Sequence, residues 1–480
     1  MSGFTDRYGL ALSTSSRVAA ERYVEAVALF DSGNLGGEEL LAKAMQADEG
    51  FALPHARLAL RHMFEGRPAE AKSSAERARA LTGGISRREQ QHVEVIAAQV
   101  TGDMDRAKTL AREHVAEFPR DTPILMLATF AFAQQNDRLE QGLALLQQHQ
   151  DAYDDWWFLG MLRMHLQETD QLAAARRAAE RSLTLYPRNG VAAHGLAHVF
   201  YETNDHSAGL DFLDGWMAPY PSGAPQHCHF TWHLALFDNT SGQYQRALER
   251  FEHGSRGADS SISQLFDAAS LLWRCRLYGS TPASLPWQAV QDVVQHKAPK
   301  PAMAFMATHA AFAYAGAGDL DALAALEQQV RVVAAKGNAP ASSVSVPLME
   351  GIGAFARGDY DGAVRLLSPV AGEVVRIGGS NAQREVFEET LLEALLRAGR
   401  HDEAEALLRR RLGRRESARD RFWLGRAYAG RGNAALATES RQAGARLWAG
   451  TDADAPEFGT ATGAAPVWQR LPEAAHTSTQ

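Results

Sequence analysis

Apolar residues along this chain recur every three or four positions, the period of amphipathic helices, and alternating apolar and polar runs are almost absent. The segments "QLAAARRAAERSLTLYP" and "RAKTLAREHVAEFP" are typical. Each carries small residues where neighbouring helices can approach closely, and each ends at a proline, Pro187 or Pro119, which stops a helix. The pattern predicts an all-α protein.

Short turns separate the predicted helices at regular intervals. A Gly or Asp marks ten such turns, which lie 33 to 41 residues apart except for one gap of 76. The ten positions are Gly66, Gly102, Asp137, Asp170, Asp205, Gly242, Gly318, Gly358, Gly399 and Gly432. A period near 34 residues with a turn in the middle of each repeat is typical of tetratricopeptide repeats. We therefore predict a series of tetratricopeptide-like helical hairpins.

Interruptions of the repeat pattern divide the chain into five predicted segments. Residues 1–16 form an N-terminal segment, and 17–255 hold the first group of repeats. The pattern breaks over 256–300, which we interpret as an irregular helical insert, and resumes over 301–449. Residues 450–480 are rich in Ala, Thr, Gly and Pro without periodicity, which predicts a flexible tail.

Histidines are concentrated in the first group of repeats, where six of the 17 in the chain lie between 194 and 233. Four of them form two i,i+4 pairs, His194 with His198 and His229 with His233. Side chains four apart on a helix lie on the same face. The pairs fall on the first helices of two consecutive repeats, 190–203 and 227–240. Because stacked repeats contact their sequence neighbours, we expect the four imidazoles to meet on the concave wall.

Other polar residues occur at the same phase of the repeats or beside the histidines. Glu202 follows His198 by four residues and is a candidate proton acceptor, and Trp232, next to His233, is a candidate pocket residue. Asp267 is a further candidate for catalysis. The remaining candidates for ligand binding are Arg274, His309, Gln383 and Arg384.

Several segments, spread over about residues 8–445, resemble the tetratricopeptide repeat protein 38 (StaR-like) family. They are "YGLALSTSSRVAAERYVEAV", "AAHGLAHVFYE", "HFTWHLALFDNTSGQYQRALERFE", "DAASLLWRCRLYG" and "IGGSNAQREVFEETLLEALLRAGR". The resemblance implies a right-handed superhelix of about ten helix pairs. It also implies that the four paired histidines and Asp267 occupy motif positions, together with His309, Gln383 and Arg384. One departure is Asn381, where the family is expected to have histidine.

The histidine pairs allow three interpretations. Imidazole is a good ligand for a divalent metal such as Zn or Fe, and three of the four histidines suffice for a catalytic site with one open position. Neither pair is HExxH, since Gly195 and Phe230 occupy the second positions, so the zinc-protease mechanism is not predicted. The alternatives are a metal-free polar pocket with general acid–base histidines, and buried histidines that fix helix packing.

Composition and charge narrow the class of protein. A net charge of −8 argues against a nucleic-acid partner. The sequence contains no apolar run of 18 residues, so we predict no membrane span. Two cysteines without a CxxC motif and the absence of a signal-peptide pattern predict a cytoplasmic protein. We expect a His-rich pocket that binds a small ligand or metal, with catalysis left open. The alternative is a non-enzymatic scaffold that binds a peptide or protein segment in its concave groove.

Overall fold

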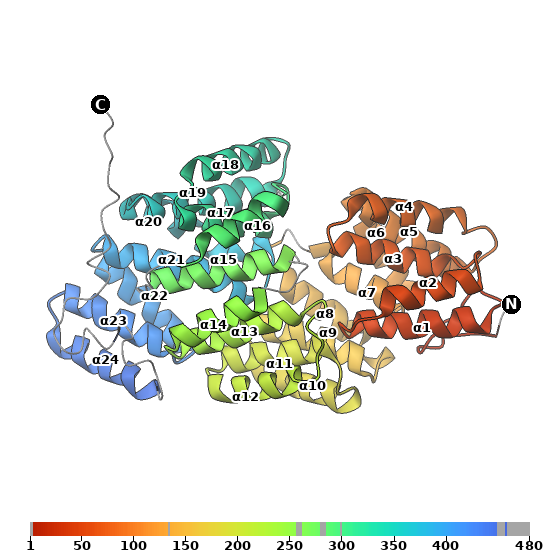
Figure 1. Ribbon diagram of the computed structural model, residues 1–480, viewed down its shortest axis with the longest axis horizontal. Helices are drawn as coiled ribbons and strands as arrows, with labels where there is room; N and C mark the ends of the chain where they lie inside the picture. Colours follow the sequence, from red (N-terminus) through yellow and green to blue (C-terminus); the bar gives the residue numbers. More distant parts are fainter. Residues whose placement is uncertain are drawn as a thin grey trace. The chain divides into compact units, whose positions relative to one another are not determined.

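The computed structural model describes residues 3–132, 135–255, 262–278, 285–297, 300–448 and 457. In this part of the chain it contains 24 α-helices joined by short turns (Figure 1). The β-structure found there is one isolated bridge between Thr5 and Ala11. The prediction of an all-α helical repeat fold is confirmed.

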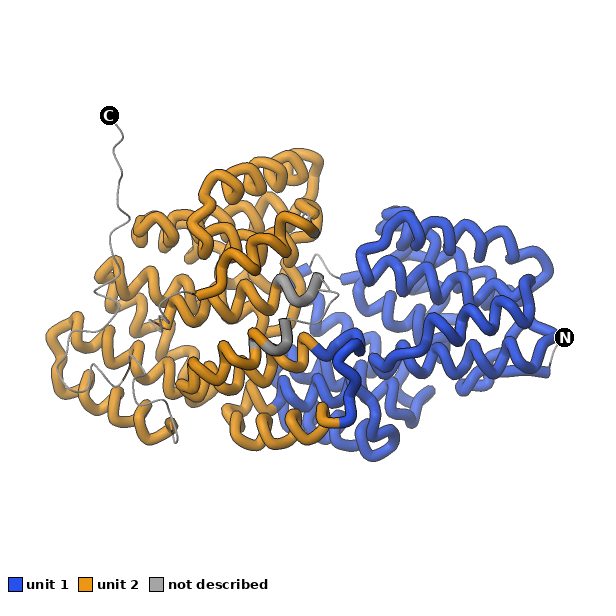
Figure 2. Tube along the Cα trace, in the orientation of Figure 1, with its two compact units in different colours: residues 1–199, 219–227 blue, residues 200–218, 228–480 orange. Residues whose placement is uncertain are grey.

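The chain forms two compact units (Figure 2). Unit 1 comprises residues 1–199 and 219–227, and unit 2 comprises 200–218 and 228–480. Helices α1 to α10 belong to unit 1: α1 (Arg17–Asp31), α2 (Gly37–Ala47), α3 (Ala52–Phe64), α4 (Pro68–Ala80), α5 (Arg87–Thr101), α6 (Met104–Glu117), α7 (Thr122–Thr129), α8 (Arg138–His149), α9 (Trp156–Glu168) and α10 (Leu172–Leu185).

Two helices, α11 (Gly190–Glu202) and α13 (His227–Thr240), are continuous across the points where the chain is divided. The other helices belong to unit 2: α12 (His206–Met217), α14 (Tyr244–Ser255), α15 (Ile262–Leu277), α16 (Trp287–Lys297), α17 (Ala304–Ala317), α18 (Leu320–Ala335), α19 (Val346–Ala356), α20 (Tyr360–Leu367), α21 (Asn381–Arg397), α22 (His401–Arg414), α23 (Ala418–Gly430) and α24 (Ala434–Leu447). One large apolar cluster runs through this unit from Tyr244 to Trp448.

The turns inside the helix pairs have a local cause in the sequence. Gly102 ends α5 in the left-handed region, with φ of 82°, which a residue without Cβ adopts at no steric cost. The next residue, Asp103, accepts a hydrogen bond from the backbone N–H of Arg106 and so caps α6. The same Gly-Asp step joins α17 to α18 and α19 to α20. In these three pairs the signals that end one helix and begin the next lie within the turn itself.

The ten predicted turns all lie between the two helices of a pair, from α3/α4 to α13/α14 and from α17/α18 to α23/α24. Two further pairs, α1/α2 and α15/α16, bring the described total to twelve. The turn of α15/α16 lies partly outside the described residues, and α1 packs against α2 as in the other pairs. The turn pattern did not indicate these two pairs, because neither had a recognised turn, and the resemblance implied about ten pairs.

The segment 256–300, predicted as an irregular insert, holds α15 and α16, with 256–261, 279–284 and 298–299 outside the described residues. Helix α15 has 16 residues and packs against α16, α17 and α21. This segment thus contributes a helix to the core of unit 2 in the same way as the repeats do. The predicted domain limits themselves stay a prediction.

Almost all of the predicted tail, 450–480, lies outside the described residues. The exception is Glu457, which is buried in unit 2. Its carboxylate forms an ion pair with Arg419 and accepts a hydrogen bond of 2.7 Å from the Tyr244 hydroxyl. Glu457 therefore compensates the charge of an arginine in the core of unit 2.

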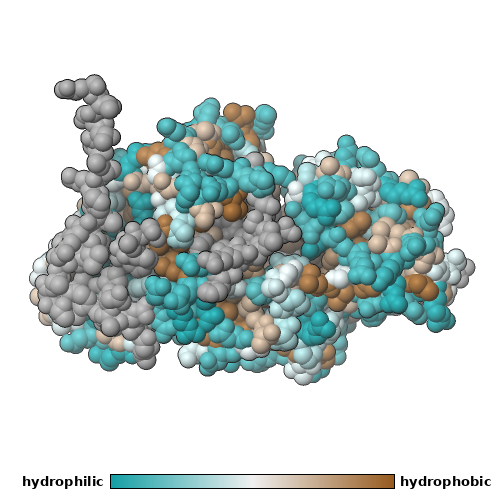
Figure 3. Space-filling model, viewed as in Figure 1, coloured by the Kyte–Doolittle hydropathy of each residue, from teal (hydrophilic) through white to brown (hydrophobic). Residues whose placement is uncertain are grey.

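Among the described residues, no helix is both long and apolar enough to cross a membrane. The face seen in Figure 3 is mainly hydrophilic, and hydrophobic side chains occur on it as small separate patches.

Candidate metal centre

Helix α11 carries the first histidine pair. Asn189 precedes the helix, and its side-chain oxygen accepts a hydrogen bond from the backbone N–H of Ala192, which fixes where the helix begins. His194 and His198 are one turn apart, and their Nε2 atoms are separated by 2.9 Å. The His198 side chain is almost fully buried, at 1% exposure, whereas His194 is half-buried. Both imidazoles therefore direct Nε2 to the same point.

Helix α13 carries the second pair. The ring centroids of His229 and His233 are 4.8 Å apart and the rings are nearly perpendicular. Trp232 is buried, and its ring stacks on that of His229 at a centroid distance of 5.3 Å. His233 has no exposed surface. The predicted pocket residue Trp232 thus restricts the orientation of one imidazole.

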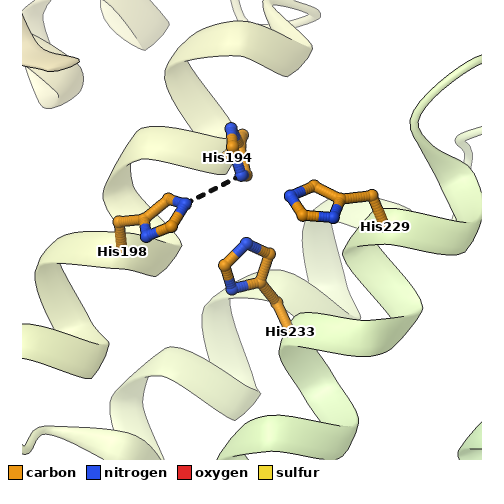
Figure 4. A group of neighbouring side chains, drawn as sticks. All are labelled: His194, His198, His229 and His233. Atoms are coloured by element: carbon orange, nitrogen blue, oxygen red, sulfur yellow. Dashed lines mark hydrogen bonds between the residues drawn. The ribbon is translucent and has the colours of Figure 1, made fainter. Parts of the chain in front are cut away.

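The four histidines form one cluster, with two from α11 and two from α13 (Figure 4). One ring nitrogen of each lies within 4.8 Å of a ring nitrogen of every other. The predicted helices 190–203 and 227–240 match α11 and α13 to within one residue. Helical spacing and repeat phase together were sufficient to predict this grouping.

The carboxylate of Asp267, on α15, contacts the imidazole of His229. Its Oδ2 lies 2.6 Å from Nδ1 of His229, and its Oδ1 accepts a hydrogen bond of 3.3 Å from Nε2 of Gln383. Because a carboxylate accepts, Nδ1 of His229 is the donor and carries the proton. The Nε2 atom is then the basic nitrogen, which is the form in which imidazole binds a metal.

Gln383 has two roles in the first turn of α21. Its Oε1 accepts from the backbone N–H of Ser380, and its own backbone N–H donates to the Ser380 hydroxyl, which completes a capping box. The Nε2 atom of the same amide then points to Asp267. The start of α21 therefore fixes Asp267, and Asp267 fixes His229.

The two predicted arginines are engaged within the protein. Arg274 has no exposed surface, and it donates to Ser270 Oγ at 3.1 Å and to the Ala382 carbonyl at 2.6 Å, with Glu389 at 3.1 Å from its Nε. These contacts connect α15 to the start of α21. The proposed role of Arg274 as a ligand-binding residue has no contact that supports it here.

Arg384 binds the loop before α21. Its guanidinium donates to the carbonyl oxygens of Gly378 and Gly379 and, at 2.6 Å, to Oδ1 of Asn381. Asn381, the departure from the family pattern, therefore helps to hold Arg384 in place.

Glu202 is buried near the end of α11, where its carboxylate pairs with two arginines of unit 2. The distances are 2.5 Å to Arg414 and 3.6 Å to Arg415. These ion pairs offset the cost of burying the carboxylate. The arrangement favours an ion-pairing role for Glu202 over the proposed proton-accepting one.

His309, on α17, lies in an aromatic environment. Phe266, Phe305, Phe312 and Phe387 surround its ring at centroid distances of 4.1 to 6.0 Å, and Nδ1 donates to the Phe305 carbonyl at 2.8 Å. Burial lowers the pKa of His309 to about 4, and the charge of Arg274 adds to this effect. His309 is thus a neutral packing residue at pH 7.

We predict that His309 contributes to acid lability. Unfolded histidine takes up a proton near pH 6.5 and the folded residue near pH 4, so stability is lost as the pH falls between these values. The contribution is up to about 3 kcal/mol by pH 4. In urea unfolding from pH 7 to pH 4, His309→Gln should lose stability less steeply than the wild type. The exposed-residue variant His296→Gln should behave like the wild type, and equal slopes for all three proteins would contradict the prediction.

A row of buried carboxylates on α21 was missed. Glu385, Glu389 and Glu393 are spaced by four residues and are buried or nearly so. Glu385 pairs with Arg411 and Arg415 at 2.7 and 2.5 Å. These charges hold the pKa of Glu385 low despite its burial. The i,i+4 spacing of acids on an otherwise apolar helix was the available signal.

A second missed group is the cluster around Asp121 in unit 1. The carboxylate contacts His92 at 2.9 Å, His114 at 3.1 Å and Arg88 at 2.9 Å, and all four side chains are buried. Burial raises the pKa of Asp121, but the contacts with His92, His114 and Arg88 outweigh it and bring the pKa well below its usual value. Arg88 and His92 are four residues apart on α5, which was an available signal, but no spacing indicated that His114 of α6 and Asp121 join them.

No family model matches the chain. Similar solved structures include human IFIT1 as a dimer with m7Gppp-AAAA, at 14% identity over 83% of this chain and 90% of that one, with a TM-score of 0.40. A monomeric IFIT1 mutant with Gppp-AAAA gives the same TM-score, and the human dimer with PPP-AAAA gives 0.37. At this identity the likeness concerns the fold alone. The chain is an all-α, tetratricopeptide-like helical repeat protein with a four-histidine cluster.

One prediction about partners is corrected by this finding. We excluded nucleic acid because of the net charge of −8, but the similar structures are of a helical repeat protein with capped or triphosphate RNA. A net charge averages over the whole chain and does not describe local surfaces. The exclusion is therefore wrong. The likeness does not in turn assign RNA binding to this chain.

Proposed function

We propose that this helical repeat protein binds one divalent transition metal ion through the imidazoles of His194, His198, His229 and His233. The observation that carries the proposal is the 2.6 Å contact between Nδ1 of His229 and Asp267. Metal-binding histidines usually donate their second ring N–H to a carboxylate, which orients the ring and raises its basicity. His92 and His114 in unit 1 also contact a carboxylate, that of Asp121, but His229 in addition lies in a group with three further imidazoles.

The spacing of the nitrogens supports a site with three ligands more than one with four. With Zn–N bonds of about 2.0–2.1 Å, two ligands of one ion are about 3.3 Å apart in a tetrahedron and at most about 4.2 Å apart. The Nε2 atoms of His194 and His198 are 2.9 Å apart, so their distance needs to increase only slightly to reach the tetrahedral separation. The full set extends over as much as 4.8 Å. Either the widest separation contracts by about 1.5 Å to form a tetrahedral site with four ligands, or one imidazole stays outside the coordination sphere.

The donor set narrows the choice of ion. Imidazole without thiolate suits Zn, Cu, Fe and Ni, and Zn or Fe are our candidates. Three ligands and an open position would allow the ion to act as a Lewis acid or to activate water. The fourth histidine would then be placed to accept a proton. The structure offers no substrate, and we assign no reaction.

We also infer that the chain belongs to the tetratricopeptide repeat protein 38 family. The segments that resemble it include both histidine pairs, Asp267 and Gln383. The contacts from Gln383 through Asp267 to His229 give these separate motif positions a common physical role.

The test is the metal content of the full chain purified without a histidine tag. We expect about one equivalent of Zn or Fe in the wild type by elemental analysis and little in His229→Ala. Asp267→Asn should keep the ligands but bind the ion about 10- to 100-fold more weakly. The control is His296→Ala, which removes an exposed imidazole on α16 and should retain the metal.

Sub-stoichiometric metal in the wild type, with the same content in His229→Ala, would contradict the proposal. That outcome would leave the alternatives of a metal-free polar pocket or an interaction scaffold.

A further inference from the structure

Arg163, on α9 in unit 1, is a buried cation without an acidic partner in the described part of the chain. Its side chain is 2% exposed, and Nη2 donates to the Val191 carbonyl at 2.9 Å. The buried Nε has no hydrogen-bond partner among the described residues, and no carboxylate there lies within ion-pair distance. Burial lowers the pKa of Arg163 to about 10, so the residue is still charged at pH 7.

Four other arginines of similar burial are compensated by a carboxylate, and a fifth, Arg384, donates to three oxygens of the loop before α21 and its first residue. The pairs are Arg57 with Asp31, Arg88 with Asp121, Arg274 with Glu389 and Arg419 with Glu457. Removing a charge from water costs several kcal/mol, and an opposite charge normally offsets that cost. Arg163 lacks this compensation from the described chain, which points to an anion from outside it.

The guanidinium of Arg163 lies against Gly195 of α11. A Cβ atom placed on Gly195 would be 2.0 Å from Nε and 2.2 Å from Cζ of Arg163, so only glycine leaves room for the arginine. Gly195 is the neighbour of His194 and lies three residues before His198. Since Cβ atoms at i and i+3 of a helix are about 5–6 Å apart, the guanidinium lies within about 8 Å of both Cβ atoms.

A cavity of about 160 Å³ lies nearby in unit 1, although Arg163 is not itself among its lining residues. Val191, whose carbonyl accepts from Arg163, lines it, as do Trp157 and Met161 of α9. Arg57 and Arg61 also line the cavity, and they are paired with Asp31 and Glu65. An apolar cavity of similar size, about 150 Å³, holds a benzene molecule in another protein, so there is space for a small ligand.

We propose that Arg163 binds the oxyanion group, a carboxylate or a phosphate, of a small-molecule ligand beside His194 and His198. The planar guanidinium suits such a group because it presents two parallel N–H donors. The same ligand would also contact the histidine cluster only if the proposed metal function is correct. Binding of an anion at Arg163 does not depend on the proposed metal function.

The proposal is tested by titrating the full chain with sodium acetate and, separately, with sodium phosphate at constant ionic strength, by calorimetry. We expect saturable binding of at least one anion to the wild type and a loss of about 10- to 100-fold in Arg163→Gln. Gly195→Ala should cause a similar loss, because the new methyl group displaces the guanidinium. The preferred anion identifies the group as carboxylate or phosphate. Arg177→Gln, which removes an exposed charge from α10, should bind as the wild type does.

Metal content is measured on the same samples. If the wild type contains metal, Arg163→Gln should contain as much, because no ligand is removed. If the wild type contains none, the proposed function fails, and the titration of the metal-free chain still decides the role of Arg163. Should both variants misfold, thermal unfolding of the wild type gives the answer, because a bound anion raises Tm and chloride at equal ionic strength does not. Unchanged affinity in folded Arg163→Gln, or no binding and no Tm shift with either anion in the wild type, overturns the proposal.

Discussion

Replacing His198 and His233 together with alanine is expected to abolish metal binding in the full chain. The variant removes one buried imidazole from α11 and one from α13. Apparent binding free energies of about 10–16 kcal/mol for four-ligand zinc sites correspond to about 3 kcal/mol for each ligand. Two lost ligands therefore weaken binding by about 10⁴-fold. Competition titration with a chromophoric chelator measures the affinity.

The two single variants and a control pair make this result specific. Each single variant should lose about 100-fold. The control, His62→Ala with His206→Ala, removes two largely enclosed histidines that are not in the cluster, and it should keep the wild-type affinity. Equal losses in the control pair would indicate that the affinity depends on general packing, and would count against the four-histidine site.

Arg274→Met is expected to cause the largest loss of stability among the candidate residues. It leaves the Glu389 carboxylate in the core of unit 2 with the Tyr278 hydroxyl, at 2.5 Å, as its remaining close partner. It also removes the donor to the Ala382 carbonyl at the start of α21. Breaking a buried ion pair by removing one partner costs about 3–5 kcal/mol. Denaturant unfolding followed by circular dichroism measures the change.

Two further variants separate charge from packing. Arg276→Met, in the same helix, removes a half-buried arginine that donates to the Ala315 carbonyl at 3.3 Å, and should cost about 1 kcal/mol. Combining Arg274→Met with Glu389→Gln should recover part of the loss, since no uncompensated charge remains. A loss below that of Arg276→Met would show that Arg274 does not hold α15 to α21.

Local signals account for the parts of the fold and site that were predicted. The turns at Gly or Asp marked the junction between the two helices of a pair, and i,i+4 spacing with repeat phase predicted the histidine cluster. Both depend on residues close in sequence. The same reasoning selected Asp267, whose hydrogen bond to His229 crosses only 38 positions.

Partners that come from distant repeats could not be predicted in this way. Glu202 is paired with Arg414, 212 residues away, and Arg274 is bonded to Ala382, 108 residues away. Spacing within one helix contains no information on which later helix packs against it. For this reason Glu202 and Arg274 were assigned to chemistry although the structure places both in ion pairs of the protein interior.

The link from Gln383 through Asp267 to His229 has an evolutionary consequence. The oxygen of the Gln383 amide accepts a hydrogen bond in the cap of α21, and its nitrogen donates one to Asp267. Glutamate at this position would therefore preserve the cap but repel the carboxylate of Asp267. Substitutions at residues 229, 267 and 383 should therefore occur together among related chains, with glutamine retained wherever the acid–histidine pair is retained. Coupled variation at these three positions would distinguish members that keep the centre from members that have lost it.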